Sequence, residues 1–229
     1  MANDILSYLE MCGREGLSLQ RGMNFRAGTG YSIILMSRRS NAPYLDRIED
    51  NGATLIYEGH DEPRTARLPN PKSVDQPATT YRGSLTQNGK FHEAAQRYLQ
   101  GELPPERVRV YEKIHAGIWS YNGLFHLVGS WIEDDGQRQV FKFRLVAVED
   151  DAYVGEEGSA ELESSRLIPS AVKLEVWQRD GGRCVRCGAA DNLHFDHIIP
   201  YSKGGTSLSA ENIQLLCARH NLAKRDRIE

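Results

Sequence analysis

The sequence has no run of apolar residues near the roughly 20 that a membrane-spanning helix needs. Its first residues, MANDILSYLEMCGREG, lack the basic start and apolar stretch of a secretory signal. Only four cysteines occur in 229 residues, and the net charge of -3 gives no overall basic excess of the kind that nucleic-acid binders carry. These absences predict a cytoplasmic protein with reduced cysteines and no membrane partner, and they leave its function to local features.

Charge is unevenly distributed along the chain. Residues 149–163 hold seven acidic side chains and no basic one, whereas residues 166–229 hold ten basic side chains against seven acidic ones. The acidic stretch is also rich in Gly and Ser and shows no periodicity, which is typical of a linker. The pattern predicts a domain over residues 1–148, a linker over 149–165 and a second domain over 166–229.

Apolar runs and turn residues predict a mixed α+β fold for the first domain. Strands are expected at 31–36, 53–57, 108–112, 124–131 and 140–148, and a helix at 92–99. Asn51-Gly52, Asn122-Gly123 and Asp135-Gly136 supply turn chemistry between strands. In the second domain a helix is expected over 170–179, capped by Ser170 and ended by Gly181-Gly182.

Three of the four cysteines lie in paired-ligand spacing. Cys184 and Cys187 form a CxxC pair, and Cys217 and His220 form a CxxH pair, with 29 residues between the two pairs, while Cys12 stands alone. Two such pairs supply the four soft or borderline ligands of a tetrahedral structural zinc. The spacing therefore predicts one bound Zn²⁺.

The residues between and after these pairs include Asp196-His197, Asn212 and Asn221. This arrangement closely resembles the HNH nuclease family in its zinc-containing HNN variant. The resemblance implies a ββα-metal fold, with His197 as the general base and Asn212 bracing the loop that orients it. It also implies that Asp196 and Asn221 hold one catalytic Mg²⁺ or Mn²⁺. In the other interpretation, His220 is the last histidine of the motif and the zinc keeps three cysteines.

Several neighbouring polar residues have less defined roles. Lys203, Lys224 and Arg225 are candidates for gripping DNA phosphates, although a solvated basic helix end explains the last two equally well. His194 is expected to pack or to support the site from outside it.

The first domain shows a second resemblance, carried by VRVYEKIHAGIWSYNGLFHLVGSWIEDDGQRQVFKFRL from Val108 and by YLDRIEDNGATLIYEGHD from Tyr44. These stretches resemble the SRA (SET- and RING-associated) domain, a twisted β-barrel of the PUA superfamily, and a related PUA-class barrel would also explain them. The resemblance implies a pocket for a flipped modified cytosine, with Tyr44 and Tyr57 sandwiching the base and Asp46 accepting from its amine. The spacing between the tyrosines is one residue longer than in the family, which leaves Asp50 as the alternative acid. The resemblance to SRA domains also places Asn88-Gly89-Lys90 in a loop near DNA.

Together the two resemblances predict a bacterial modification-dependent endonuclease. It would bind double-stranded DNA carrying 5-methylcytosine or 5-hydroxymethylcytosine, cut nearby, and pair as a homodimer because one HNH site cuts one strand. Two other functions fit the same residues, namely an HNH endonuclease that reads unmodified sequence and a non-catalytic zinc-containing DNA-binding protein.

Overall fold

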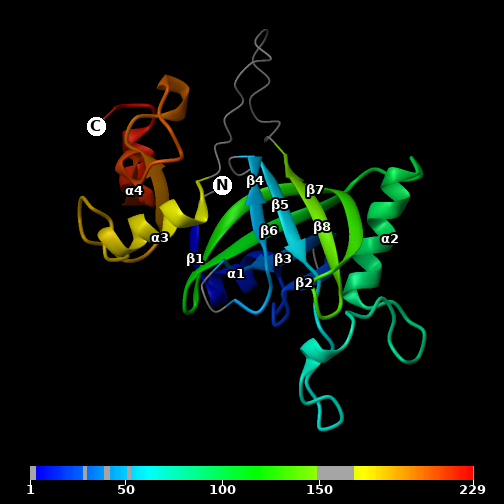
Figure 1. Ribbon diagram of the computed structural model, residues 1–229. Helices are drawn as coiled ribbons and strands as arrows, with labels where there is room; N and C mark the ends of the chain where they lie inside the picture. Colours follow the sequence, from blue (N-terminus) through cyan, green and yellow to red (C-terminus); the bar gives the residue numbers. More distant parts are fainter. Residues whose placement is uncertain (1–3, 28–29, 39–41, 51–52, 149–167, 229) are drawn as a thin grey trace.

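The computed structural model describes residues 4–27, 30–38, 42–50, 53–148 and 168–228 (Figure 1). The predicted linker at 149–165 and the Asn51-Gly52 turn lie outside the described residues. No helix of the described part is long and apolar enough to cross a membrane.

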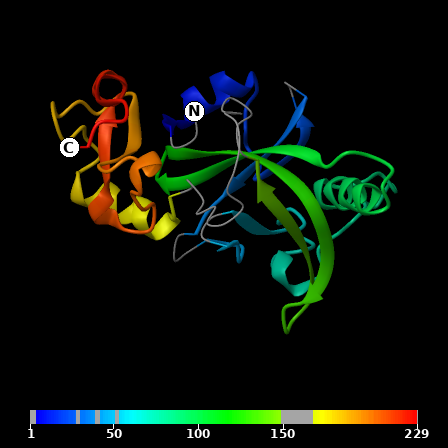
Figure 2. The ribbon, with the colours of Figure 1, turned by 90° about the horizontal axis from the view of Figure 1, so that it is seen from above.

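The N-terminal part is built on one large twisted sheet with helices against it (Figures 1 and 2). Its strands are β1 (Ile5–Ser7), β2 (Met23–Ala27), β3 (Tyr31–Met36), β4 (Arg47–Glu49), β5 (Thr54–Glu58), β6 (Glu106–His115), β7 (Ile118–Asp134) and β8 (Gln139–Ala147). Its helices are α1 (Tyr8–Glu15), the 3-10 helix η2 (Pro71–Ser73) and α2 (Gln87–Leu99). The strand order is β2-β3-β6-β7-β8-β5-β4, with β1 added on β7. Only the β3–β6 pair is parallel among these described strands.

The sheet buries one main core against α2 and a smaller one against α1. The main core gathers Tyr57, Phe91, Phe125, Phe143 and their aliphatic neighbours, each at most 2% exposed. In β8, Phe141, Phe143 and Leu145 alternate with polar residues, a pattern typical of a half-buried strand, but Lys142 is also buried because it pairs with Glu58 at 2.8 Å. Helix α1 begins with a capping box between Ser7 and Glu10 and covers the second core.

The C-terminal part is a ββα unit preceded by one helix. It contains α3 (Ser170–Arg179), β9 (Leu193–His197), η4 (Tyr201–Lys203), η5 (Ala210–Asn212), β10 (Ile213–Cys217) and α4 (Ala218–Lys224). Strands β9 and β10 pair antiparallel, with Asp196 opposite Gln214. The predicted α+β class is confirmed, as is the order of two strands and a helix.

Three local predictions are wrong. Asn122 and Gly123 lie inside β7 at a register shift opposite Val110 and Tyr111, and the chain turns earlier, at Gly117, whose φ is +74°. Asn88-Gly89-Lys90 lies in the first turn of α2, where the Asn88 side chain holds the backbone of His60. Ser170 is the first helical residue rather than the cap. In the first two cases tertiary contacts outweigh the local turn preference.

Candidate functional site

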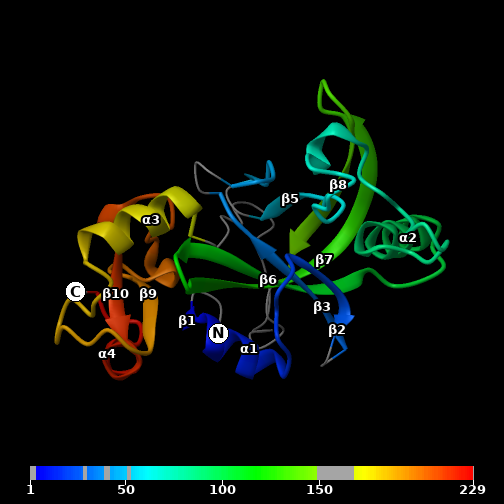
Figure 3. The ribbon, with the colours of Figure 1, turned by 90° about the horizontal axis from the view of Figure 1, so that it is seen from below.

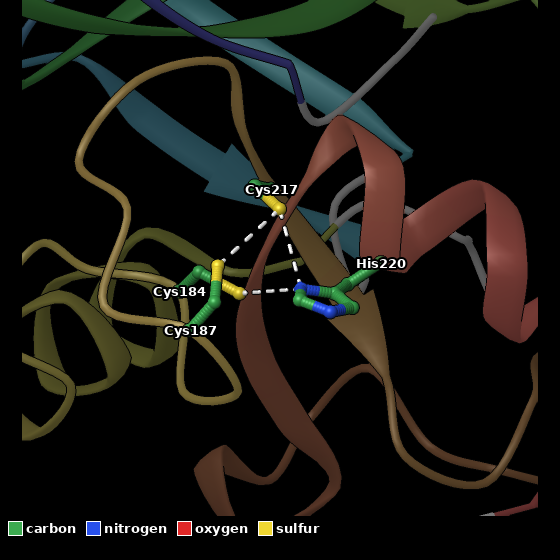
Figure 4. Close-up of side chains that lie close together, drawn as sticks. All are labelled: Cys184, Cys187, Cys217 and His220. Atoms are coloured by element: carbon green, nitrogen blue, oxygen red, sulfur yellow. Dashed lines mark hydrogen bonds between the residues drawn. The ribbon is translucent and has the colours of Figure 1, made fainter.

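The four predicted zinc ligands form one cluster in the C-terminal part (Figure 4). Their ligand atoms all lie within 4.8 Å of one another. Nδ1 of His220 is 3.4 Å from Sγ of Cys184 and 3.3 Å from Sγ of Cys217. Sγ of Cys187 is 3.8 Å from Sγ of Cys217. A tetrahedron with Zn–S bonds of about 2.3 Å has S···S edges of about 3.8 Å, so the donor set and its spacing fit zinc.

Local sequence shapes this cluster. Gly188 has φ +74° and donates its N–H to the Cys184 carbonyl at 2.8 Å, which closes the turn that brings the two cysteines of the first pair together. Burial opposes ionisation of Cys184, but backbone amides and His220 outweigh it and lower the pKa of the thiol to about 6. A thiolate is the form that binds a metal. Because His220 supplies the fourth ligand of the tetrahedron, this geometry favours a zinc site of three cysteines and one histidine over one of three cysteines alone.

Asp196 and His197 end β9, beside the cluster. The Asp196 carboxylate is 3.0 Å from Nζ of Lys224 and accepts from the Gln214 amide at 3.3 Å. Lys224 also donates to the His197 carbonyl oxygen, so one ammonium holds both residues of the dipeptide. Nε2 of His197 is 2.9 Å from the Ser207 hydroxyl. These contacts fix the backbone and side chains of the predicted catalytic pair.

Asn212 braces the loop that follows β9. Its Oδ1 accepts from the Ile199 amide at 2.8 Å, and its Nδ2 donates to the carbonyls of Ile199 and Thr206 at 3.1 and 2.9 Å. Gly205 sits so close that an added Cβ would lie 1.8 Å from the Ile199 carbonyl oxygen. The side-chain amide of Asn212 therefore ties both ends of the 199–206 loop.

The remaining predicted residues of this part differ in exposure. Lys203 and Arg225 are exposed, and Asn221 is partly exposed on α4, one turn before Lys224. Lys224 is 1% exposed and faces Asp196, so the prediction that it grips DNA phosphates is wrong. A buried ammonium is held by its carboxylate partner and is not available at the surface to contact a phosphate. His194, expected to support the site, bonds to Asp4 at 3.0 Å, a contact that no sequence signal indicated.

A cavity of about 660 Å³ lies in the N-terminal part. Its lining includes the three residues predicted for the base pocket, Tyr44, Asp46 and Tyr57. Asp50, the alternative acid, is exposed and is not among the lining residues. The structure thus brings together residues that are up to 13 positions apart in the sequence.

His60 is a lining residue that sequence reasoning missed. Its ring stacks on Tyr44 with centroids 4.9 Å apart and planes 8° apart, and its Nε2 is 2.8 Å from the Tyr57 hydroxyl. Burial lowers the pKa of His60 to about 4, so the ring is neutral near pH 7. The available signal was its place in Tyr57-x-Gly-His, three positions after a predicted pocket residue.

Asp46 is held by two backbone donors, the amides of Ser37 at 3.3 Å and Glu58 at 3.2 Å. Burial raises the pKa of its carboxyl to about 7, although these amides act in the other direction. The carboxyl therefore changes protonation near neutral pH while it faces the cavity.

Comparison with known proteins identifies the C-terminal part. Residues 184–227 match the HNH endonuclease family, a range that contains the four cluster residues and Asp196, His197, Asn212 and Asn221. The prediction of an HNH endonuclease domain is confirmed. No curated protein sequence matches the chain.

Solved structures similar to this chain include SRA domains. The SUVH5 SRA complex with hemi-methylated CG DNA is 23% identical, with a TM-score of 0.42, over 62% of this chain and 84% of that chain. The SUVH5 SRA bound to fully hydroxymethylated CG DNA is also 23% identical, with a TM-score of 0.41, over 61% and 81%. Arabidopsis thaliana SUVH6 in complex with SAM is 20% identical, with a TM-score of 0.38, over 64% and 24%.

Proposed function

We propose that this chain is a modification-dependent DNA endonuclease. The N-terminal part binds 5-methylcytosine or 5-hydroxymethylcytosine flipped out of duplex DNA, and the HNH domain hydrolyses a phosphodiester bond nearby. One observation carries this proposal. The chain joins an HNH domain at 184–227 to a cavity walled by two tyrosines, a histidine and a carboxyl group.

The cavity suits a planar base. Its volume of about 660 Å³ falls in the roughly 300–1,000 Å³ range of ligand sites. Flipping a nucleotide out of the duplex costs a few kcal/mol, which stacking on aromatic rings can offset. The Tyr44 ring already stacks on a neutral ring, that of His60, which supports its role as the stacking surface. Asp46 would accept a hydrogen bond from the exocyclic amine of cytosine.

The HNH domain supplies the hydrolysis. His197 accepts the proton of the attacking water, because a neutral imidazole nitrogen can act as a general base and the hydroxyl of Ser207 orients the ring through Nε2. Asn212 holds the loop that carries this geometry. Asp196 and Asn221 offer oxygen atoms that would hold a Mg²⁺ or Mn²⁺ ion, which when bound would neutralise charge at the scissile phosphate.

The cysteine and histidine cluster has a separate role. With all four positions filled by protein ligands, a zinc ion there has no open site for substrate and serves as structural metal.

The products of the proposed hydrolysis are a 3′-hydroxyl and a 5′-phosphate. Since one HNH site cuts one strand, we infer that two copies act together on a duplex, as a homodimer or a transient pair in a bacterial cytoplasm.

One plasmid in three forms tests the proposal, carrying cytosine, 5-methylcytosine or 5-hydroxymethylcytosine. Each is incubated with the protein and Mg²⁺ or Mn²⁺, with a chelator control. We expect cleavage of a modified form only, lost in His197→Ala and made unselective or lost in Tyr44→Ala. Equal cleavage of all three forms would favour an HNH endonuclease whose cavity does not select modified cytosine. Absence of cleavage with either metal would favour a non-catalytic DNA-binding protein.

A further inference from the structure

The β6–β7 hairpin borders both the cavity and the nuclease domain. Gly117 and Trp119 line the cavity, whereas Ile118 between them packs against the apolar core of the C-terminal part. Alternate residues of a strand face opposite sides, so one hairpin end forms a wall of the cavity and a docking surface at once. Figure 3 shows this hairpin end directed at the C-terminal part, with α2 at the opposite end of the sheet.

The strand β3 repeats the same arrangement at its end. Ser37 lines the cavity and donates its amide to Asp46, and the next residue, Arg38, donates to the hydroxyl of Ser170 on α3 at 3.4 Å. Two separate segments that wall the cavity therefore also contact the nuclease domain.

The two parts share an apolar core. Ile5 of β1 is 8% exposed and belongs to the same buried cluster as Val172 of α3 and Phe195 of β9. Phe195 precedes Asp196 directly, so the strand that ends in the catalytic pair rests on the N-terminal part. A contact of this kind buries apolar surface that a freely tethered domain would expose to water.

A buried polar cluster fixes the position of α3 on the sheet. Lys173 is 0% exposed, and its Nζ lies 2.6 Å from Oδ1 of Asn122 and 3.4 Å from Oε2 of Glu112. Asn122 donates in turn to Glu112 at 3.1 Å. Glu112 and Asn122 are 2% and 3% exposed. A buried charge tolerates few alternative positions, because any shift of α3 would leave the ammonium without its partners.

A second polar contact holds β9. His194 bonds to Asp4 at 3.0 Å and also bridges to it through the backbone, while Arg14 pairs with Asp4 at 2.7 Å. His194 is two residues from Asp196 on the same strand. Both the helix and the catalytic strand of the nuclease domain are thus anchored on the N-terminal part.

We propose that this docked interface, centred on Lys173, Glu112 and Asn122, sets a fixed distance between the bound modified base and the cut. The connecting segment at 149–165 joins the two parts without setting that distance. The distance rule rests on the proposed function, whereas the docking can be measured without DNA.

The docking is tested first on protein alone. A specific protease site is placed within 149–165, the chain is cut there, and the products are passed over a size-exclusion column. We expect the two fragments of the otherwise wild-type protein to elute together. Lys173→Met, which leaves Glu112 buried without its ammonium, should separate them, whereas the exposed-lysine control Lys90→Met should not. Separation of the wild-type fragments would overturn the docking. Co-elution of the Lys173→Met fragments, once zinc content and circular dichroism show that both are folded, would overturn the central role of Lys173, Glu112 and Asn122 in the docking.

The distance rule is tested on a duplex with one modified cytosine, by mapping the cut on each strand. We expect one dominant position for the wild type and the same position when about ten Gly and Ser residues are added within 149–165. Lys173→Met should spread the cuts over several positions. A cut that moves with the added residues would overturn the rule. Cleavage of wild type without dependence on modification would overturn the proposed function and the rule with it, while co-elution would still establish the docking.

Discussion

Loss of one cluster cysteine should unfold the C-terminal part while the N-terminal part stays folded. Residues 168–228 form a unit of about 60 residues with one small apolar core. A core of this size supplies roughly 3–5 kcal/mol of stability. Structural zinc contributes about 10–16 kcal/mol in zinc-finger peptides near pH 7, so its loss exceeds what the core can replace. Docking through Ile5 and Ile118 adds apolar burial, but the stabilisation lost with the zinc still far exceeds what the apolar core supplies.

The variant Cys217→Ser measures this effect, with Cys12→Ser as the matched control. Cys12 is a partly buried cysteine of the N-terminal part, 3.5 Å from the Leu19 amide and outside the cluster. We expect about one zinc per chain in the wild type and control and little in Cys217→Ser. Amide hydrogen exchange should show lost protection in β9, β10 and α4, with β6 to β8 still protected.

A Cys217→Ser protein with wild-type thermal unfolding and unchanged exchange in β9 and β10 would refute the reasoning. It would mean that the apolar core alone holds the ββα unit, and that the cluster is not a structural metal site. Removal of zinc from the wild type by a strong chelator should reproduce the Cys217→Ser exchange pattern, which separates loss of metal from damage by the substitution.

Four further outcomes are expected. His197→Ala should lower cleavage by about 10²–10⁴-fold and leave DNA binding unchanged, measured by single-turnover cleavage and by binding with a chelator present. Lys224→Met should raise the Mn²⁺ concentration needed for half-maximal stabilisation in thermal unfolding, because Asp196 loses its buried anchor; an unchanged midpoint would contradict this. Lys203→Ala and Arg225→Ala should each reduce the salt slope of DNA binding by about one if that residue contacts a phosphate. The folded-state pKa of Asp46 is about 7 and lies above the unfolded value of about 3.9. The contribution of Asp46 to the free energy of unfolding is therefore full below about pH 4 and is lost as the pH rises to about 7. Asp46→Asn should flatten the pH–stability curve between these values.

The sequence determined the chemistry of the C-terminal part. Ligand spacing alone predicted which four side chains would meet, because two short pairs on tight turns leave few other ways to fill a tetrahedron. Apolar runs and the alternation of apolar with polar residues predicted β3, β5, β6 and β8 in the N-terminal part, since both patterns are local properties of the sequence. The pairing of Tyr44 with Tyr57 around one cavity followed from a resemblance rather than from any local rule.

Only the tertiary structure decided the environment of single side chains. Lys224 and Lys173 read as ordinary basic helix residues, yet both are buried because a carboxylate from a distant segment meets each of them. Asn122-Gly123 has turn chemistry but lies within β7, where pairing with β6 outweighs local preference. His60 lines the cavity, where its ring stacks on Tyr44. Most of all, the placement of the nuclease on the wall of the cavity depends on contacts between residues more than 50 positions apart, which no local pattern records.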